Sequence, residues 1–166
     1  MDTLDIIRQR RSIREYKNDM PKDTDIEKIL EAARWAPSGL NNQPWRFLVV
    51  KDKAKKEGLA AFTKYAKVIK GAPIVIAVCM DIADSYNRDK DLMAIGASIQ
   101  NICLEAYALG LGTCWLGEIL NNKEGVAKYL KLDKDLEVMA VVTLGYPEEE
   151  ITEGCRKSLK NLEISE

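Results

Sequence analysis

The stretch DLMAIGASIQNICLEAYAL, residues 91–109, is the strongest helical pattern in the chain and decides what can surround it. Its larger apolar residues recur at the spacing of one helix face: Leu92, Ile95, Ile99, Ile102, Cys103, Ala106 and Leu109. Small residues fill much of the first half of the stretch: Ala94, Gly96, Ala97 and Ser98. Gly110 follows at the position of a C-terminal cap. We therefore expect a central, closely packed helix that ends at this glycine.

Four segments of strand length accompany this helix: residues 45–50, 73–80, 113–116 and 137–144. The second, PIVIAVCM, is continuously apolar, which suits a strand covered on both faces. Further helices are expected at residues 2–9, 53–67 and 122–130, and another between a capping box, Thr24 to Glu27, and Pro37. Because strands and helices mix throughout and no linker or repeat separates them, we predict one α+β domain over residues 1–166.

Charge and composition narrow the class of function. The chain of 166 residues carries 25 basic and 26 acidic residues, a net charge of -1 that gives no support to a nucleic-acid or membrane-surface role. The longest apolar runs fall short of the roughly 20 residues that a membrane span needs. The first residues lack the apolar run of a secretory signal. We expect a cytoplasmic protein.

The chain contains no histidine, which excludes Ser-His-Asp and Cys-His catalysis and histidine-ligated metals. None of its four cysteines lies in a C-x-x-C pair, so neither a zinc site nor a thioredoxin-like site is expected. If the protein is an enzyme, a cofactor is therefore the natural carrier of the difficult chemistry.

Three arginines and a serine cluster in the segment Arg10-Arg11-Ser12-Ile13-Arg14. Arginine presents a planar fork that matches phosphate oxygens, and the serine adds a neutral donor. The segment follows an expected helix, so it could form a phosphate cradle. The alternative is a solvated basic turn, and the segment taken alone favours that alternative.

Two prolines delimit the loop Pro37-Ser38-Gly39-Leu40-Asn41-Asn42-Gln43-Pro44, which is rich in small and amide residues. Gly39 permits a close approach of the backbone to a ligand. The serine and amide side chains offer uncharged donors and acceptors. Such a loop suits a flat heteroaromatic ring with a polar edge, and on its own it suits a well-capped structural turn just as well.

Two later segments are weak by themselves. Residues 110–117, GLGTCWLG, lie between the long helix and a strand, but their spacing is not that of the G-x-G-x-x-G dinucleotide pattern. The pair Arg156-Lys157 lies in a polar tail.

Taken in order, these four segments resemble the nitroreductase family of FMN enzymes, and the resemblance runs from about Leu4 to Leu159. It implies a nitroreductase-like fold, a mixed, mainly antiparallel sheet flanked by helices, in an intertwined homodimer with FMN at the subunit interface. It also implies these FMN-binding residues: Arg10, Arg11, Ser12, Arg14, Pro37, Ser38, Gly39, Asn41, Leu116, Gly117 and Arg156.

The resemblance assigns a role to each group. Arg10 and Arg156 would bind the phosphate, and Arg11 would contribute through its backbone. Residues 37–41 would reach the flavin of the other subunit. The backbone amides of Leu116 and Gly117 would face the reactive nitrogen of the flavin. Lys67 is a candidate for the pyrimidine edge.

The implied activity is an FMN-dependent oxidoreductase that passes a hydride from NADH or NADPH, through the flavin, to a nitroaromatic, a quinone or free flavin. FMN carries the chemistry, so no catalytic side chain is assigned. The compact segment 81–90 leaves the acceptor open. An FMN carrier, storage protein or sensor is the alternative, and an interaction module without cofactor is a further one.

Overall fold

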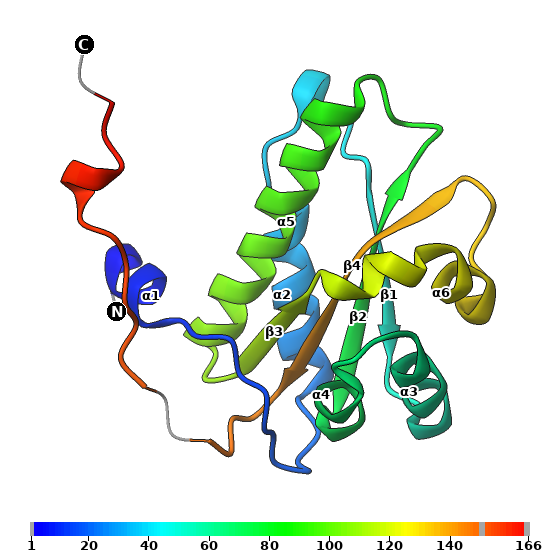
Figure 1. Ribbon diagram of the computed structural model, residues 1–166, viewed down its shortest axis with the longest axis horizontal. Coiled ribbons are helices and arrows are strands. Elements are labelled where there is room, and N and C mark those ends of the chain that lie inside the picture. Colours follow the sequence, from blue (N-terminus) through cyan, green and yellow to red (C-terminus); the bar gives the residue numbers. More distant parts are fainter. Residues whose placement is uncertain (1, 150–151, 165–166) are drawn as a thin grey trace.

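The computed structural model describes residues 2–149 and 152–164 and builds them around a four-stranded sheet (Figure 1). Its strands are β1 (Trp45–Val50), β2 (Ile74–Asp81), β3 (Gly112–Leu116) and β4 (Leu136–Gly145), in the order β1-β2-β4-β3. All three strand pairs are antiparallel. The single parallel contact outside them is an isolated bridge between Ser12 and Thr113. The predicted mainly antiparallel sheet flanked by helices is confirmed.

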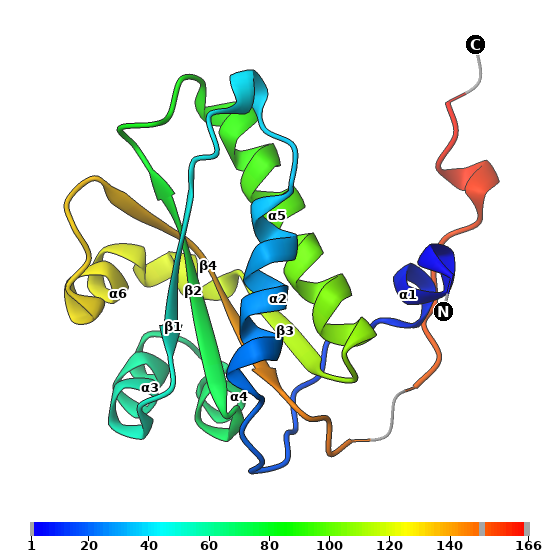
Figure 2. The same cartoon turned by 180° about the vertical axis from the view of Figure 1, so that it is seen from behind.

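Helices cover both faces of this sheet (Figures 1 and 2). The longest, α5 (Arg88–Ala108), packs with α2 (Asp23–Arg34) on one face. The other face carries α3 (Lys53–Leu59), α4 (Ala66–Gly71) and α6 (Lys123–Leu130). The first helix, α1 (Thr3–Gln9), and the segment 152–164 lie together on one side of the molecule, beyond α5.

Strand β2 supplies both hydrophobic cores, because its side chains alternate between the two faces. Ile74, Ile76, Val78 and Met80 pack under α2 and α5. Val75, Ala77 and Cys79 pack under α3, α4 and α6. Nearly every residue of the strand is buried, as its continuous apolar sequence predicts.

The end of α5 confirms the predicted glycine cap. Gly110 adopts a left-handed conformation with a φ of 77°. Its amide donates to the Tyr107 carbonyl at 3.0 Å, and the Leu111 amide donates to the Ala106 carbonyl at 2.8 Å. This pair of bonds closes the helix and turns the chain into β3.

Two expectations about helix boundaries are wrong. The capping box at Thr24 does not form, because α2 begins two residues earlier than that cap implies, at Asp23, with Lys22 as its N-cap and no side-chain cap. The helix expected over residues 53–67 is broken into α3, a 3-10 turn (Ala60–Phe62) and α4. The break coincides with contacts from the 3-10 helix at Glu118–Asn122: Asn122 donates to the Phe62 carbonyl at 2.9 Å.

We expect Glu137 to make folding stability depend on acid pH. Its carboxylate receives two hydrogen bonds from Arg88, at 2.7 and 2.9 Å, and one from Lys123 at 2.5 Å. The Arg88 bonds, helped by Lys123, lower the pKa of Glu137 to about 2. Because the folded pKa lies below the unfolded value of roughly 4.3, this stabilisation is present above pH ~4.3 and is lost as pH falls toward 2.

Glu137→Gln should therefore lower the free energy of unfolding by roughly 1–2 kcal/mol at pH 7, since both cations are half-exposed and screened. Urea melts at pH 7 and at pH 2 measure this. Glu57→Gln, on the exposed side of α3, is the control. A difference between wild type and Glu137→Gln that stays constant over this range would contradict the expectation.

Candidate functional site

The basic turn, residues 10–14, is attached to the start of β3. The Ile13 amide donates to the Thr113 carbonyl at 2.8 Å, and Ser12 forms the parallel bridge to the same residue. The turn can approach so closely because Gly112 has no side chain: a Cβ there would lie 2.6 Å from Cγ1 of Ile13. The glycine that begins β3 thus lets the strand hold a turn that lies about a hundred residues earlier in the sequence.

Tyr16 fixes the other end of the turn. Its hydroxyl donates to the Ile13 carbonyl at 2.5 Å and lies 2.7 Å from the Thr143 hydroxyl of β4. Burial raises the pKa of the Tyr16 phenol, so the hydroxyl stays protonated and remains a donor. The turn is therefore held against two neighbouring strands by groups that carry no charge.

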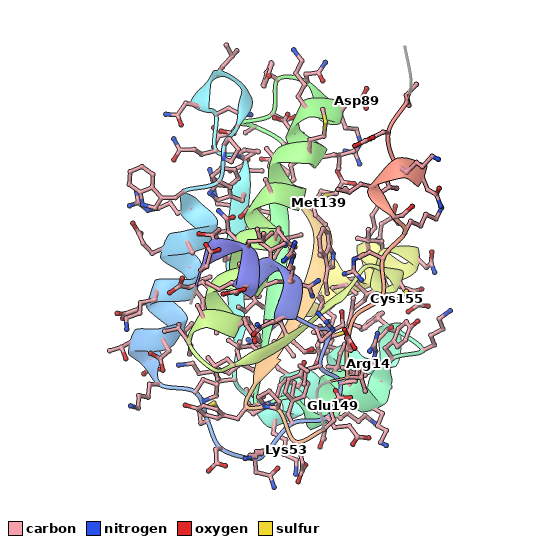
Figure 3. All side chains as sticks on the ribbon, turned by 90° about the vertical axis from the view of Figure 1, so that its left-hand side faces the viewer. Arg14, Lys53, Asp89, Met139, Glu149 and Cys155 are labelled. Carbon is pink, nitrogen blue, oxygen red and sulfur yellow. The ribbon has the colours of Figure 1, made fainter. Side chains whose placement is uncertain are left out.

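A cavity of about 280 Å³ opens beside the turn. It is lined by Arg10, Arg11, Ser12, Ile13, Arg14, Glu149, Thr152 and Arg156. The structure thereby brings together all four residues predicted in the basic turn with the arginine predicted in the tail. Figure 3 shows Arg14, Glu149 and Cys155 in the same region, far from Asp89 at the other end of α5.

Within the described part of the chain, the guanidinium groups of this cavity have no carboxylate partner within salt-bridge distance. In residues 2–149 and 152–164, no salt bridge involves Arg10, Arg11, Arg14 or Arg156. The Arg10 Nε is buried and lacks a hydrogen-bond partner. Three of these side chains donate to backbone carbonyls instead: Arg11 to Arg8, Arg10 and Thr152 at 2.6–3.0 Å, Arg14 to Ser12 at 3.1 Å, and Arg156 to Cys155 at 2.7 Å.

Glu149 is a site residue that the sequence did not indicate. Its carboxylate accepts hydrogen bonds from the backbone amides of Arg14 and of Glu15, the latter at 3.2 Å. It ties the segment after β4 to the basic turn. The residues lie 135 positions apart, so no local pattern could have signalled the contact.

The loop of residues 37–43 lies at the opposite end of α5 from the basic turn. Asn42 donates to Asp91 in the first turn of α5, whereas Tyr107 in its last turn donates to Gln9, beside the basic turn. Sixteen residues of helix at a rise of about 1.5 Å each, or roughly 24 Å, separate these contacts. Pro37, Ser38, Gly39 and Asn41 therefore do not join the arginines within one chain.

The backbone of this loop is strained. Leu40, Asn41 and Gln43 have φ angles of 55°, 56° and 48°, a region that non-glycine residues seldom adopt. The Ser38 hydroxyl accepts a hydrogen bond from the Gln43 amide at 3.1 Å and closes the loop. Leu40 is 85% exposed at its tip. A strained loop with an exposed apolar tip is typical of a functional segment.

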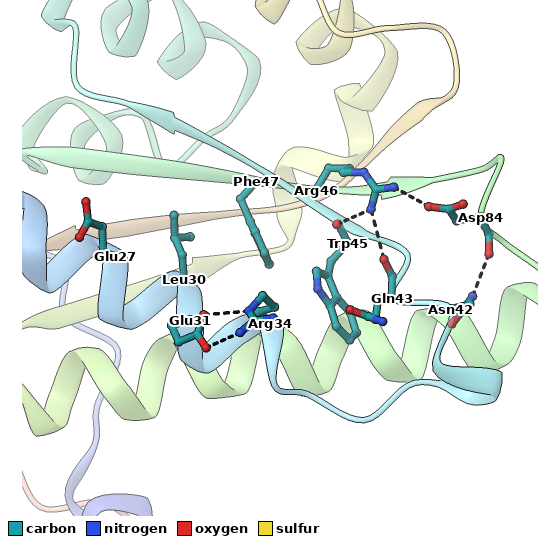
Figure 4. Close-up of a pocket in the computed structure, with 10 residues that line it drawn as sticks. All are labelled: Glu27, Leu30, Glu31, Arg34, Asn42, Gln43, Trp45, Arg46, Phe47 and Asp84. Carbon is teal, nitrogen blue, oxygen red and sulfur yellow. Dashed lines mark hydrogen bonds and ion pairs between the residues drawn. The ribbon is translucent and has the colours of Figure 1, made fainter.

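A second cavity, of about 640 Å³, lies between the loop, α2 and the edge strand β1 (Figure 4). Arg46 reaches from β1 to the Gln43 carbonyl at 3.2 Å and to Asp81 at 2.8 Å, and it also binds Asp84. Asn42 contributes a bond to the Asp84 carbonyl at 3.0 Å. The loop is thus connected to the segment that follows β2.

Leu116 ends β3, the strand to which the basic turn is attached, and Gly117 follows as the N-cap of the next 3-10 helix. Leu116 is buried, while Gly117 is exposed. The next residue, Glu118, accepts a hydrogen bond from the Thr63 hydroxyl, which lowers the pKa of its carboxyl. Lys67 is 93% exposed and lies 3.7 Å from Glu15, next to the basic turn, so it remains a candidate.

Comparison with known proteins agrees with this architecture. The sequence model of the Nitroreductase family matches residues 7–65 and 59–146. A protein of Archaeoglobus fulgidus, provisionally named NADH dehydrogenase/NAD(P)H nitroreductase, is 37% identical over 152 residues, which are 90% of this chain and 87% of that protein. The chain belongs to the nitroreductase family.

Solved structures of the family share the fold. A provisionally named nitroreductase from Desulfovibrio desulfuricans, crystallised in complex with FMN, is 43% identical with a TM-score of 0.95, covering 100% of this chain and 97% of that one. A provisionally named NADH oxidase from Clostridium acetobutylicum is 35% identical with a TM-score of 0.90, covering 98% and 99%. Among the residues described here, no helix has both the length and the apolar character needed to cross a membrane.

The approach of the basic turn to β3 can be tested at Gly112. In Gly112→Ala the new methyl group would overlap Ile13, so we expect a loss of roughly 1–3 kcal/mol in the free energy of unfolding. Gly71→Ala is the matched control, because a Cβ at the end of α4 meets no atom within 4 Å. Denaturant melts of both variants measure the effect, and equal stabilities would refute the close-approach argument.

Proposed function

We propose that this chain is an FMN-dependent oxidoreductase that passes a hydride from NADH or NADPH, through the flavin, to a small acceptor such as a nitroaromatic, a quinone or free flavin. The observation that carries the proposal is the cavity lined by Arg10, Arg11, Ser12, Arg14 and Arg156 in a chain of the nitroreductase family. The relative from Desulfovibrio desulfuricans, 43% identical, is in complex with FMN.

The donor set fits the phosphate group of FMN. A phosphate monoester carries a charge of about -1.5 to -2 at neutral pH and accepts several hydrogen bonds. The buried, unpartnered Nε of Arg10 would gain an acceptor, and guanidinium groups bind phosphate with paired donors. Glu149 adds one negative charge to the cavity, but its carboxylate is already bound to two backbone amides.

We assign Arg10, Ser12, Arg14 and Arg156 to the phosphate. Arg11 holds the turn and the tail through its side chain, which leaves its backbone for the ligand. Leu116 ends β3, the strand to which the turn is attached, and Gly117 follows it. Both residues would present backbone amides to the ring.

Bound FMN would supply the redox chemistry, accepting a hydride from the nicotinamide and releasing it to the acceptor. The protein's part is to hold the ring and keep donor and acceptor against it in turn. This division suits a chain with no histidine, since no side chain needs to act as a general base near pH 7.

We further propose that the site is shared between two subunits of a homodimer. Residues 37–41 lie roughly 24 Å along α5 from the basic turn, a separation longer than FMN can bridge within one chain. Across a two-fold axis, the loop of one subunit could meet the turn of the other.

Exposed apolar residues support this assembly. In α5, Met93 is 68% exposed, and in the tail Leu159, Leu162 and Ile164 are 75%, 61% and 98% exposed. The tail lies beside α1 and away from the sheet (Figures 1 and 2). Such surfaces are characteristic of segments that pack on a partner. A cytoplasmic location and a single domain over residues 1–166 stay predictions.

Arg10→Ala combined with Arg14→Ala should leave the protein without FMN, because the phosphate would lose its paired donors. The measurement is the visible absorption spectrum after incubation with FMN and removal of the excess. Wild type should retain about one flavin per subunit. Lys17→Ala, which removes one positive charge just outside the cavity, should retain the same amount. Full loading of the double variant would overturn the assignment.

A further outcome of the same experiment concerns the type of function. Wild-type protein that binds FMN, yet whose flavin neither NADH nor NADPH reduces, would be a carrier or sensor. Steady oxidation of nicotinamide with a quinone present would support the reductase.

The dimer is expected to depend on the apolar tail. Light scattering should give wild type a mass twice that of the chain, 18.7 kDa. Leu159→Glu combined with Leu162→Glu should shift the protein toward monomer and weaken FMN binding at the same time. Lys160→Glu places one acidic residue in the same segment without removing apolar surface and should stay dimeric. A double variant that remains a fully loaded dimer would refute the role of the tail.

A further inference from the structure

Asp91, in the first turn of α5, is fully buried and still accepts four hydrogen bonds. Its Oδ1 accepts from the Asn42 side chain at 2.8 Å. Its Oδ2 accepts from the Ser85 hydroxyl at 2.7 Å and from the amides of Tyr86 and Asn87 at 3.2 Å each. A carboxylate has about four acceptor positions, and here protein donors place three bonds on Oδ2 and one on Oδ1.

All four donors are neutral groups, so this carboxylate is stabilised by dipoles instead of a salt bridge. Burial acts against the charged form, but the hydrogen bonds outweigh it and hold the pKa of Asp91 below its usual value. Its position in the first turn of α5 adds the favourable field of the helix N-terminus. The Asp91 carboxylate is therefore a buried anion that fixes the positions of the four groups that donate to it.

The Asn42 amide has one orientation available. Its nitrogen faces two acceptors, the Asp91 carboxylate at 2.8 Å and the Asp84 carbonyl at 3.0 Å. A flipped amide would place its oxygen against both of them, which is repulsive. Both hydrogens of the nitrogen are thus committed, one to α5 and one to the segment after β2.

Asn42 lies between the strained residues of the loop. Leu40, Asn41 and Gln43 have positive φ angles, while Asn42 has an ordinary φ of -72°. The left-handed conformation is unfavourable for residues other than glycine, and such backbone persists only where other contacts impose it. The bond from Asn42 to Asp91 is the contact that ties the centre of the strained stretch to a helix.

Asp91 also positions the segment that covers the loop. Through the amides of Tyr86 and Asn87 it fixes the turn before α5. The Tyr86 side chain then lies against Gly39, where a Cβ would be only 1.8 Å from the tyrosine hydroxyl. The Asp91 carboxylate therefore holds the loop through the Asn42 side chain. It also holds, through a backbone amide, the residue Tyr86 that covers the loop at Gly39.

We propose that Asp91 is a positioning residue, which sets the conformation of the loop 37–43 through Asn42 and so prepares the half of the site that meets the flavin ring. The proposal rests on the function proposed above for the loop. Asp91 itself is fully buried and does not line the cavity at the basic turn. Its effect should therefore fall on ring binding and leave the phosphate contacts of the basic turn unchanged.

The test compares two asparagines that make similar bonds. Asn42→Ala removes the link from the loop to Asp91. Asn101→Ala removes a bond of the same length, 2.8 Å, from the same donor group to a neutral acceptor, the Ala32 carbonyl of α2, and it does not touch the link to Asp91. FMN and riboflavin, which lacks the phosphate, are titrated against both variants, wild type and Arg10→Ala by flavin fluorescence.

Asn42→Ala should raise the Kd of FMN and of riboflavin by the same factor, about tenfold, the typical effect of losing a hydrogen bond to a charged group. Asn101→Ala should change neither by more than about twofold, although its stability falls similarly. Arg10→Ala should weaken FMN far more than riboflavin. Equal effects of the two asparagine variants on flavin binding would overturn the proposal.

A second measurement identifies Asp91 itself. Adding Asn42→Ala to Asp91→Asn should raise the flavin Kd little further, because both changes break one link. Fully additive effects would contradict the link. If Asp91→Asn does not fold, the effect of Asn42→Ala alone on the flavin Kd still tests the proposal.

Amide hydrogen exchange keeps the test independent of the proposed function. Residues 37–43 should exchange faster in Asn42→Ala than in Asn101→Ala, with no flavin present. If wild type binds neither flavin, the proposed function fails, and this comparison still tests the positioning role. Unchanged protection of the loop would refute it.

Discussion

The rest of the structure depends on the burial of β2 on both faces. Ile76 and Val75 are adjacent in sequence, yet they pack into opposite cores, and neither is exposed. A strand of this kind is stable only if apolar elements cover both sides of the sheet. It therefore divides the helices into two layers and places the long α5 along one face. The two parts of the candidate site lie at opposite ends of that helix.

The length of α5 has a functional consequence that a shorter helix would not have. A site that needs both ends of a helix about 30 Å long must be closed by a second molecule. The helix has few charged residues beyond its first turn, and Met93 leaves apolar surface uncovered in the single chain. The long helix α5 thus separates the two parts of the site. It also provides apolar surface through which a second copy of the chain could bring them together.

The sequence predicts best what depends on neighbours along the chain. The alternation and apolar character of residues 45–50 and 73–80 locate β1 and β2 to within a residue, and Gly110 ends α5 as its spacing indicates. The sequence fails where a distant contact competes with local preference. The helix expected over residues 53–67 breaks at residues that bond to Glu118 and Asn122. Lys22 precedes α2 although Thr24 is the better cap by type.

One part of the candidate site can likewise be predicted from the sequence and the other cannot, because the electrostatics of the two parts differ. The arginines of the basic turn can be found from sequence because their charge is a property of the residues themselves. The role of Asp91 cannot be found in this way, because it arises from its own burial and from a side-chain amide 49 residues away. The arginines of the turn form no salt bridge with any residue that the structure describes, so an anionic ligand would complete the turn. The loop is held by a carboxylate that already accepts four hydrogen bonds from the protein, so its conformation does not depend on a ligand. Binding at such a site would spend little free energy on ordering the loop, and the charge of the phosphate would contribute mainly to affinity.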